Sequence, residues 1–204
     1  MSRYRGPKIR IIRRLGDLPG LTAKTTSRNT LPGQHKKVRD KVSKGSSYSV
    51  RLQEKQKLRY NYGLNEKQLS NYVKEAKRLK GSTGSVLLQL LEMRLDSIMF
   101  RCGLGRSIAA SRQLVSHGHI YVNDRKITIP SFQCKPNDRI EVKNNETSKK
   151  LVVNLLEQSL QNPVPNFLTF DTNTLKGKVT RVIENNEVNL DINQFLIVEY
   201  YSRK

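Results

Sequence analysis

The run from residue 94 to residue 123 constrains the fold most, because it predicts a helix, a short loop, a second helix and a hairpin in immediate succession. Ser107 is well suited to cap the second helix, and Gly118 can end it in a left-handed conformation. Apolar and polar residues then alternate, as in a half-buried strand, and Asn123-Asp124 is a tight-turn signal. The run therefore predicts a small mixed module whose polar side chains lie on the faces that the core does not use.

The helix after Ser107 has one apolar side and one polar side when its residues are placed about 100° apart. The apolar side holds Ile108, Ala110, Leu114 and Val115. The polar side holds Ala109, Arg112, Gln113 and Ser116, with Arg106 at its edge. Such a face is often merely solvated. Here the small Ala109 leaves room for a close approach, and the next strand and turn add imidazole, phenol and guanidinium groups. These groups suit phosphate and 2′-hydroxyl contacts, so the pattern favours RNA over DNA.

Positive charge is concentrated at the start of the chain. The net charge is +21 over 204 residues, and residues 1–60, with 17 basic and 3 acidic residues, hold +14 of it. Residues 151–204, with 5 basic and 6 acidic residues, are nearly neutral. The excess predicts a polyanionic partner, since released counterions favour its binding. A membrane is disfavoured as that partner, because no apolar run approaches the ~18 residues of a spanning helix and Trp is absent.

Apolar periodicity is weak in residues 1–50, so this part is expected to be extended and to become ordered against its partner. It has no apolar core of a signal peptide, and Pro and Gly interrupt any transit-type helix, so the N-terminus is expected to be mature. Helices are predicted at residues 52–62, 66–80, 86–99 and 149–161. Strands are predicted at residues 119–123, 127–129, 139–143, 167–170, 178–183 and 195–201.

No motif in the chain supports catalysis. Arg94-Leu95-Asp96 resembles the tripeptide around the nucleophilic Asp of pseudouridine synthases, but an apolar-striped helix with an adjacent Arg better explains Asp96 as a structural residue. His117 and His119 lack thiols at zinc-site spacing, so hydrogen bonding or stacking is expected of them rather than metal binding. Only two cysteines occur, which favours a reducing compartment. We therefore expect a protein that is not an enzyme and needs no metal or cofactor.

Several motifs together resemble one family along nearly the whole chain. The central ones, Arg94-Leu95-Asp96, Arg112-Gln113-Leu114-Val115-Ser116-His117-Gly118 and Val122-Asn123, resemble the RNA-binding module named after the fourth small-subunit ribosomal protein. The flanking ones resemble that ribosomal protein family itself rather than other hosts of the module. They include Arg3-Tyr4-Arg5-Gly6-Pro7-Lys8, Pro32-Gly33-Gln34-His35, Lys80-Gly81-Ser82-Thr83-Gly84 and Leu196-Ile197-Val198-Glu199-Tyr200-Tyr201-Ser202.

The resemblance implies an α+β fold, in which a mainly helical domain carries an inserted helix-helix-β-hairpin RNA-binding module and a basic, extended N-terminal arm. The implied divisions are an arm at 1–45, a helical domain at 46–88, the RNA-binding module at 89–150 and a C-terminal helix and strands at 151–204. The last segment is a candidate for completing the helical domain. Many bacterial members hold zinc through four Cys in the arm. This chain has no Cys before Cys102, so metal is not expected.

By the same resemblance, the protein is expected to be a structural component of the small ribosomal subunit. It would be a primary binder of 16S rRNA in the 5′ domain, nucleate assembly of the subunit body and contribute to translational accuracy. The family also lines the path by which mRNA enters and contacts other small-subunit proteins, notably the fifth and the twelfth. An Asn-rich stretch at 185–189 resembles plastid-encoded members, so the chloroplast stroma is the expected location, with a bacterial cytoplasm as the alternative.

The charge pattern and the resemblance together assign RNA contacts to a set of basic and hydrogen-bonding residues. They are Arg3, Arg5, Lys8, Arg10, Arg13, Arg14, Lys55, Lys57, Arg94, Arg106, Arg112, Gln113, Ser116, His117, His119, Tyr121, Asn123, Arg125 and Lys126. A second set matches the region that the family places near the incoming mRNA. It consists of Lys36, Lys37, Arg39 and Lys41.

Overall fold

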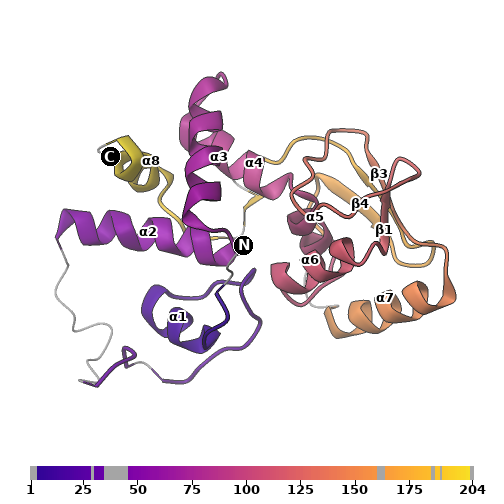
Figure 1. Ribbon diagram of the computed structural model, residues 1–204, viewed down its shortest axis with the longest axis horizontal. Helices are drawn as coiled ribbons and strands as arrows, with labels where there is room; N and C mark the ends of the chain where they lie inside the picture. Colours follow the sequence, from indigo (N-terminus) through magenta and orange to yellow (C-terminus); the bar gives the residue numbers. More distant parts are fainter. Residues whose placement is uncertain are drawn as a thin grey trace. The chain divides into compact units, whose positions relative to one another are not determined.

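The chain divides into two units in the computed structural model, which describes residues 4–28, 30–34, 46–159, 164–184, 187–188 and 190–202. The first unit combines residues 1–87 with residues 190–204, and the second is the continuous segment 88–189 (Figure 1). The fold is α+β and mainly helical, as the sequence predicts. The C-terminal segment is shared between the units, because residues 151–189 cluster with the central module and only the last residues return to the first unit.

The first unit is built from helices. Their bounds are α1 Lys8–Leu15, α2 Ser47–Asn61, α3 Glu66–Arg78 and α8 Gln194–Ser202, and α4 Thr83–Glu92 runs from this unit into the second. The Ser46 hydroxyl caps α2. Asn65 and Gln68 form a capping box at the start of α3, each side chain bonding the other residue's backbone N–H. These local signals explain why two basic sequences with modest apolar content still form helices.

Helix α1 corrects the expectation that the N-terminal fifty residues are extended. It begins after Pro7 and ends at Gly16, whose φ of 98° suits a residue without a Cβ. Ile11, Leu15 and Leu18 form a small buried cluster, against which Leu21, Tyr60 and Leu190 pack. Pro and Gly therefore bound this helix rather than forbid it, and the N-terminal segment contributes apolar packing to its unit.

The last helix, α8, packs along α2 and also contacts α3. Aromatic and β-branched residues dominate 195–201 and predict a strand there, and that prediction is wrong. The helix is fixed by long-range polar contacts instead: the Asn193 N–H donates to Glu54 at 2.9 Å, and the Tyr201 hydroxyl donates to Glu66 at 2.9 Å. Tertiary contacts have thus overridden local β propensity.

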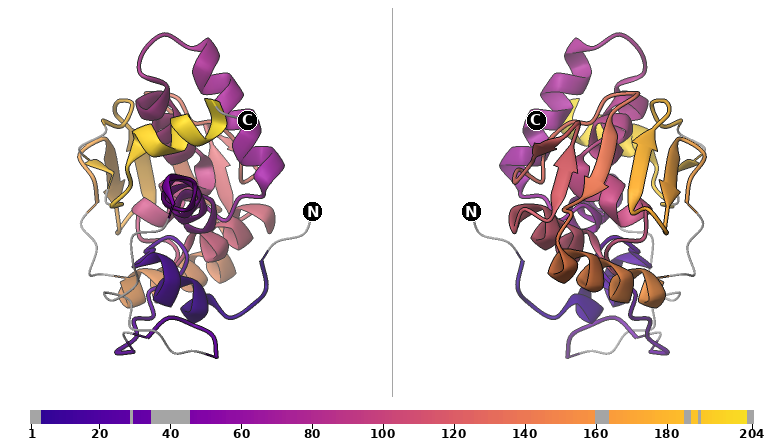
Figure 2. Two further views of the ribbon diagram at one scale, coloured as in Figure 1. Left: turned by 90° about the vertical axis from the view of Figure 1, so that its left-hand side faces the viewer. Right: turned by 90° about the vertical axis from the view of Figure 1, so that its right-hand side faces the viewer.

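The second unit contains an antiparallel sheet and the helices that cover one of its faces. Its helices are α5 Leu95–Arg101, α6 Ile108–Ser116 and α7 Glu146–Ser159. Its strands are β1 Ile120–Val122, β2 Arg125–Lys126, β3 Arg139–Val142, β4 Leu168–Asp171 and β5 Lys176–Val179. Among the described residues these five strands form one sheet in the order β2-β1-β3-β5-β4. The C-terminal hairpin β4–β5 therefore lies beside β3 of the central module (Figure 2).

The two faces of this sheet differ sharply in character because side chains alternate along each strand. Paired residues of one face include Ile120, Ile140, Val179 and Leu168, all buried in the core of the unit. We call this the inner face. Helices α5, α6 and α7 add Leu95, Ile98, Leu114, Val115 and Val152 to the same core. The opposite side, which we call the outer face, carries polar side chains.

The helix predicted at 86–99 is in fact two helices, α4 and α5, separated at Met93-Arg94. Arg94 has extended backbone angles and forms an isolated bridge with Gln133. The Leu95 N–H donates to the Phe132 carbonyl, and the Cys134 N–H donates to the Met93 carbonyl, each at 2.9 Å. Hydrogen bonds from a segment distant in sequence interrupt the helix here. The sequence between α4 and α5 contains no Gly or Pro, so the break could not be predicted locally.

Candidate nucleic-acid interface

Helix α6 presents a polar, exposed strip to solvent, as the spacing predicts. Ser107 caps it, since its hydroxyl accepts from the Ala110 N–H. Ile108, Leu114 and Val115 are buried. Ala109, Gln113 and Ser116 are exposed and recur at helical spacing along one strip, and Arg106 is exposed just before the cap. The strip thus offers an amide, a hydroxyl and a guanidinium beside a small residue.

Arg112 does not belong to that strip. Its side chain is 7% exposed and donates from Nε and Nη2 to Asp96 Oδ2, at 3.0 and 2.7 Å. Arg94, which is 3% exposed, donates to the same carboxylate at 3.0 and 2.7 Å. The prediction that Arg112 lies on the solvent side of α6 is wrong, because a long side chain at the margin of a helix can turn inward toward a buried acid.

The outer face of the sheet is also polar, and it adjoins the end of α6 at His117 and His119. Strand pairing places Tyr121 opposite both Lys126 and Glu141, and the Lys143 N–H donates to the His119 carbonyl at 2.8 Å. Residues paired across antiparallel strands share a face, so these side chains lie together. The rings of His117 and His119 are 6.2 Å apart, which links the end of α6 to the start of β1.

His119 reports the electrostatic character of this surface. Its Nδ1 lies 3.0 Å from the Ser148 hydroxyl at the start of α7. Burial lowers the pKa of His119 below its ordinary value, and the nearby charges of His117, Lys143 and Lys126 lower it further. The folded protein therefore favours the neutral ring, and cationic side chains lie near it. A surface with this potential attracts anions such as RNA phosphates.

Asn123 serves the hairpin itself. It and Asp124 adopt φ angles of 49° and 64°, the left-handed region that a tight two-residue turn requires. The Asn123 amide donates to Asp138 at 2.8 Å, and its Oδ1 accepts from the Arg139 N–H at 2.9 Å. Since both ends of the amide are used within the fold, Asn123 positions the turn that presents Arg125 and Lys126, both of which are exposed.

The basic residues predicted in the first unit fall into two groups. Arg5, Arg10 and Arg14 are exposed on or beside α1. The others make contacts within the fold: Lys8 donates to the Leu21 carbonyl, Arg13 to the Thr30 and Leu31 carbonyls, Lys55 pairs with Glu66 and Lys57 with Glu54. Lys55 is 3% exposed. Arg3, Lys36, Lys37, Arg39 and Lys41 lie outside the described residues.

Asp96 and both cysteines are buried within the fold. Asp96 has no solvent exposure and accepts four hydrogen bonds from two Arg side chains. Cys102 and Cys134 are buried, and burial raises the pKa of the Cys102 thiol to about 12. Within the described ranges, no group of three or more His, Cys, Asp or Glu could hold a metal ion. No described helix is long and apolar enough to cross a membrane.

The sequence predictions missed two residues near this surface: Lys143, and Ser148, which is buried and lies within hydrogen-bonding distance of His119. Lys143 follows β3 and continues the alternation of Arg139 and Glu141 onto the outer face, a signal that the sequence does contain. Ser148 falls in a segment that the sequence predicts as a loop, although α7 begins at Glu146.

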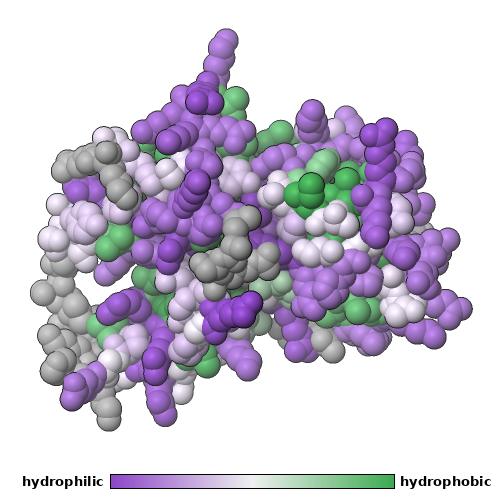
Figure 3. All heavy atoms as spheres, in the orientation of Figure 1, coloured by the Kyte–Doolittle hydropathy of each residue, from purple (hydrophilic) through white to green (hydrophobic). Residues whose placement is uncertain are grey.

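In the view of Figure 3, hydrophilic side chains cover most of the surface that is coloured, with apolar side chains in small groups.

Comparison with known proteins assigns most of the chain to two domain families. Residues 3–92 match the family Ribosomal protein S4/S9 N-terminal domain, and residues 93–140 match the family S4 domain. Similar curated proteins are the small ribosomal subunit protein uS4c of Rhodomonas salina, 59% identical over 204 residues, and that of Cyanophora paradoxa, 57% identical over 205 residues. The small ribosomal subunit protein uS4 of Thermosynechococcus vestitus is 54% identical over 208 residues. Each of these alignments covers the whole of both chains.

Proposed function

Because this chain belongs to the uS4 family of small ribosomal subunit proteins, we propose that it binds 16S rRNA directly, in the 5′ domain, and nucleates assembly of the subunit body. It is a structural component of the small ribosomal subunit and not an enzyme. The observation that carries the proposal is the polar, cationic surface of the second unit. There, His117 at the end of α6 lies beside His119 at the edge of the outer sheet face, and the cationic Lys126 and Lys143 lie near His119.

The contacts proposed on this surface involve side chains that are at least partly accessible to a phosphate backbone. They are Arg106, Gln113, Ser116, His117, His119, Tyr121, Arg125 and Lys126, to which we add Lys143. Arg5, Arg10 and Arg14 are proposed contacts of the first unit. Arg94, Arg112 and Lys55 are not retained, because ion pairs within the fold occupy their charged groups.

Contributions to translational accuracy and to the path of incoming mRNA belong to the same proposal. They rest on the family resemblance and on the basic residues at 36–41, and contacts with the fifth and twelfth small-subunit proteins rest on the resemblance alone. We also propose that the protein works in plastid ribosomes. The uS4c relatives support this location, while the uS4 relatives of Thermosynechococcus and Nostoc make a bacterial cytoplasm the alternative.

The test is binding of the purified protein to a 16S rRNA 5′-domain fragment, with chemical footprinting, against an unrelated RNA of equal length over a salt series. The expected result is localised protection of the 5′-domain fragment that persists at salt concentrations where the unrelated RNA is released. Equal binding that salt abolishes for both RNAs would contradict the proposal, since non-specific binding depends on charge alone.

A further inference from the structure

The C-terminal hairpin places two like charges directly opposite each other. In the pairing of β3 with β5, Arg139 lies across from Lys178, and in the pairing of β4 with β5, Lys178 lies across from Thr169. Like charges at directly opposed positions destabilise an antiparallel pair. The arrangement therefore does not serve the stability of the sheet.

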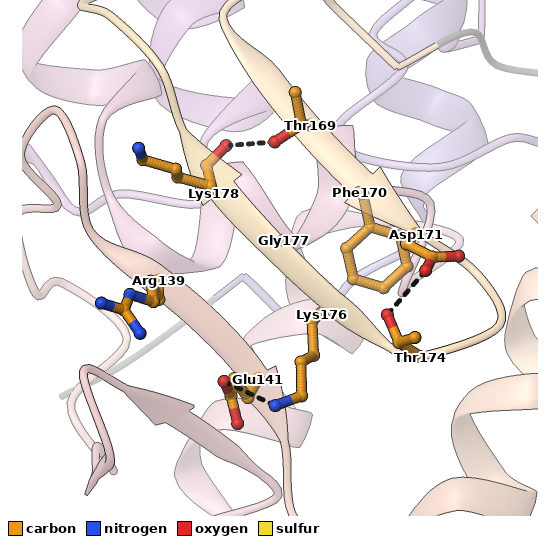
Figure 4. Close-up of a pocket in the computed structure, with 9 residues that line it drawn as sticks. All are labelled: Arg139, Glu141, Thr169, Phe170, Asp171, Thr174, Lys176, Gly177 and Lys178. Carbon is orange, nitrogen blue, oxygen red and sulfur yellow. Dashed lines mark hydrogen bonds and ion pairs between the residues drawn. The ribbon is translucent and has the colours of Figure 1, made fainter.

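No carboxylate compensates this pair among the residues that the structure describes. The neighbouring row behaves differently, because Lys176 forms an ion pair with Glu141 at 3.1 Å and Asp171 accepts from Thr174 at 2.8 Å. Figure 4 shows this contrast: a dashed line joins Lys176 to Glu141, whereas the charged ends of Arg139 and Lys178 extend without one. Both cations line a shallow pocket of about 400 Å³ over β3, β5 and β4.

This pair belongs to the same surface as His119. Arg139 lies two residues before Glu141 on β3, and Glu141 is paired with Tyr121 on one side and with Lys176 on the other. Alternation along the strands therefore puts Arg139 and Lys178 on the outer face. The outer face described for the central module thus continues across the sheet onto the hairpin that follows α7, with the ion-paired Glu141 and Lys176 between the two cationic sites.

We propose that the outer face around Arg139 and Lys178 is an additional contact for the phosphate backbone of RNA. The inference rests on the proposed function and extends its binding surface into residues 168–179, beyond the matched S4 domain. An RNA backbone fits better than a protein partner. Seven of the nine residues that line the pocket are polar or charged, the exceptions being Phe170 and Gly177, whereas the centre of a protein interface is apolar and poor in charge.

The experiment compares two charge-neutralised variants of the full chain. Arg139→Gln with Lys178→Gln removes the opposed pair, and Lys149→Gln with Lys150→Gln removes the same charge from exposed positions of α7. Binding to the 16S rRNA 5′-domain fragment is measured over a salt series. The first variant is expected to bind more weakly, with a salt slope shallower by about 1.4 to 1.8 units if it touches two fewer phosphates. The α7 variant is expected to keep the wild-type slope.

Three outcomes separate the possibilities. An unchanged slope for the hairpin variant, or an equal decrease for the α7 variant, overturns this inference while leaving the proposed function intact. Failure of the wild-type protein to discriminate the fragment contradicts the proposed function itself. An unchanged RNA slope together with poorer retention of the hairpin variant in assembled small subunits also overturns the inference and assigns the face to a protein. Thermal unfolding serves as the folding control, and no decrease in Tm is expected because the substitutions relieve a repulsion.

Discussion

Asp96 and Arg112 are joined across 16 residues of sequence by two hydrogen bonds, at 2.7 and 3.0 Å, and both side chains are buried. Arg94 adds two further bonds to the same carboxylate. One acid thereby holds the start of α5 against the middle of α6. Because α6 bears exposed residues of the candidate interface, a buried carboxylate determines where the proposed RNA-binding strip lies.

Replacement of Asp96 by Asn is expected to lower the free energy of unfolding by about 3–5 kcal/mol, since it leaves two buried guanidinium groups without a counter-charge. Urea denaturation followed by circular dichroism measures the decrease. Glu146→Gln is the matched control, because Glu146 makes only an exposed pair with Lys150, and it should change stability by less than about 1 kcal/mol. Equal effects of the two substitutions would mean that the buried cluster is not a stabilising centre.

The exposed strip of α6 is expected to contribute affinity without contributing stability. Arg106→Glu together with Gln113→Glu should weaken binding to the 5′-domain fragment, because both new carboxylates repel phosphate. Filter binding over a salt series should show a slope that falls by about 0.7 to 0.9 units for each phosphate that the variant no longer touches. Arg112→Glu, by contrast, should unfold the second unit. If the variant with Arg106→Glu and Gln113→Glu bound RNA as tightly as the wild type, the RNA would have to bind another face.

His119 should couple folding to pH. Burial, and then the charges of His117, Lys143 and Lys126, lower its pKa below 6.5, so the folded state favours the neutral ring. The stabilisation is therefore complete above about pH 6.5 and is lost as the pH falls through the lowered pKa. NMR titration of the ring measures this directly, and bound RNA should raise the pKa again. A free-protein midpoint at or above 6.5 would disagree with this account.

Leu18→Ala is expected to cost about 2–5 kcal/mol, because Leu18 is buried in the small cluster with Ile11 and Leu15. Hydrogen exchange should assign the destabilisation to the first unit. Ile9→Ala is the control on the same segment, since Ile9 is largely exposed and its truncation removes little packing. If Leu18→Ala were as mild as Ile9→Ala, the N-terminal segment would contribute no core, as its composition alone suggests.

The two thiols should be unreactive in the folded protein. Burial raises the pKa of Cys102 to about 12, and the pKa of Cys134 is raised by burial and by Asp138 among other neighbours. Thiolate, the reactive form, is therefore scarce at pH 8. A chromogenic disulfide reagent should modify neither residue until urea unfolds the second unit. Rapid labelling in native buffer would show that this core opens.

Local signals predicted the parts of the fold that local contacts determine. Ser107 and Gly118 bound α6 as expected, the second with a φ of 74°, and the turn at Asn123 needs only its own two residues. The polar strip of α6 and the His119 strand were predictable for the same reason. Arg112 was not, because helical spacing gives the direction of a Cβ and not the reach of a long side chain.

Long-range contacts decided the remaining elements. The break between α4 and α5 depends on pairing with residues 130–134, and α8 is helical because it packs on α2. Arg139 and Lys178 were also beyond prediction, since their opposition appears only once β5 is paired with β3. A count of charge over residues 151–204 averages the cation of Lys178 with acids of which most lie outside the β4–β5 hairpin, so a nearly neutral segment concealed the opposed pair.

Helix α8, which is last in the sequence but packs on α2, also determines the order in which the two units can fold during synthesis. Asn193 meets Glu54 across 139 residues, so during synthesis α2 leaves the translating ribosome long before the helix that packs on it. The second unit, by contrast, is continuous and can close while α8 is still unmade. A nascent chain would therefore display a finished central module beside an unfinished helical unit. Chaperone dependence or proteolysis during synthesis should accordingly concentrate on α2 and α3 and end when α8 emerges.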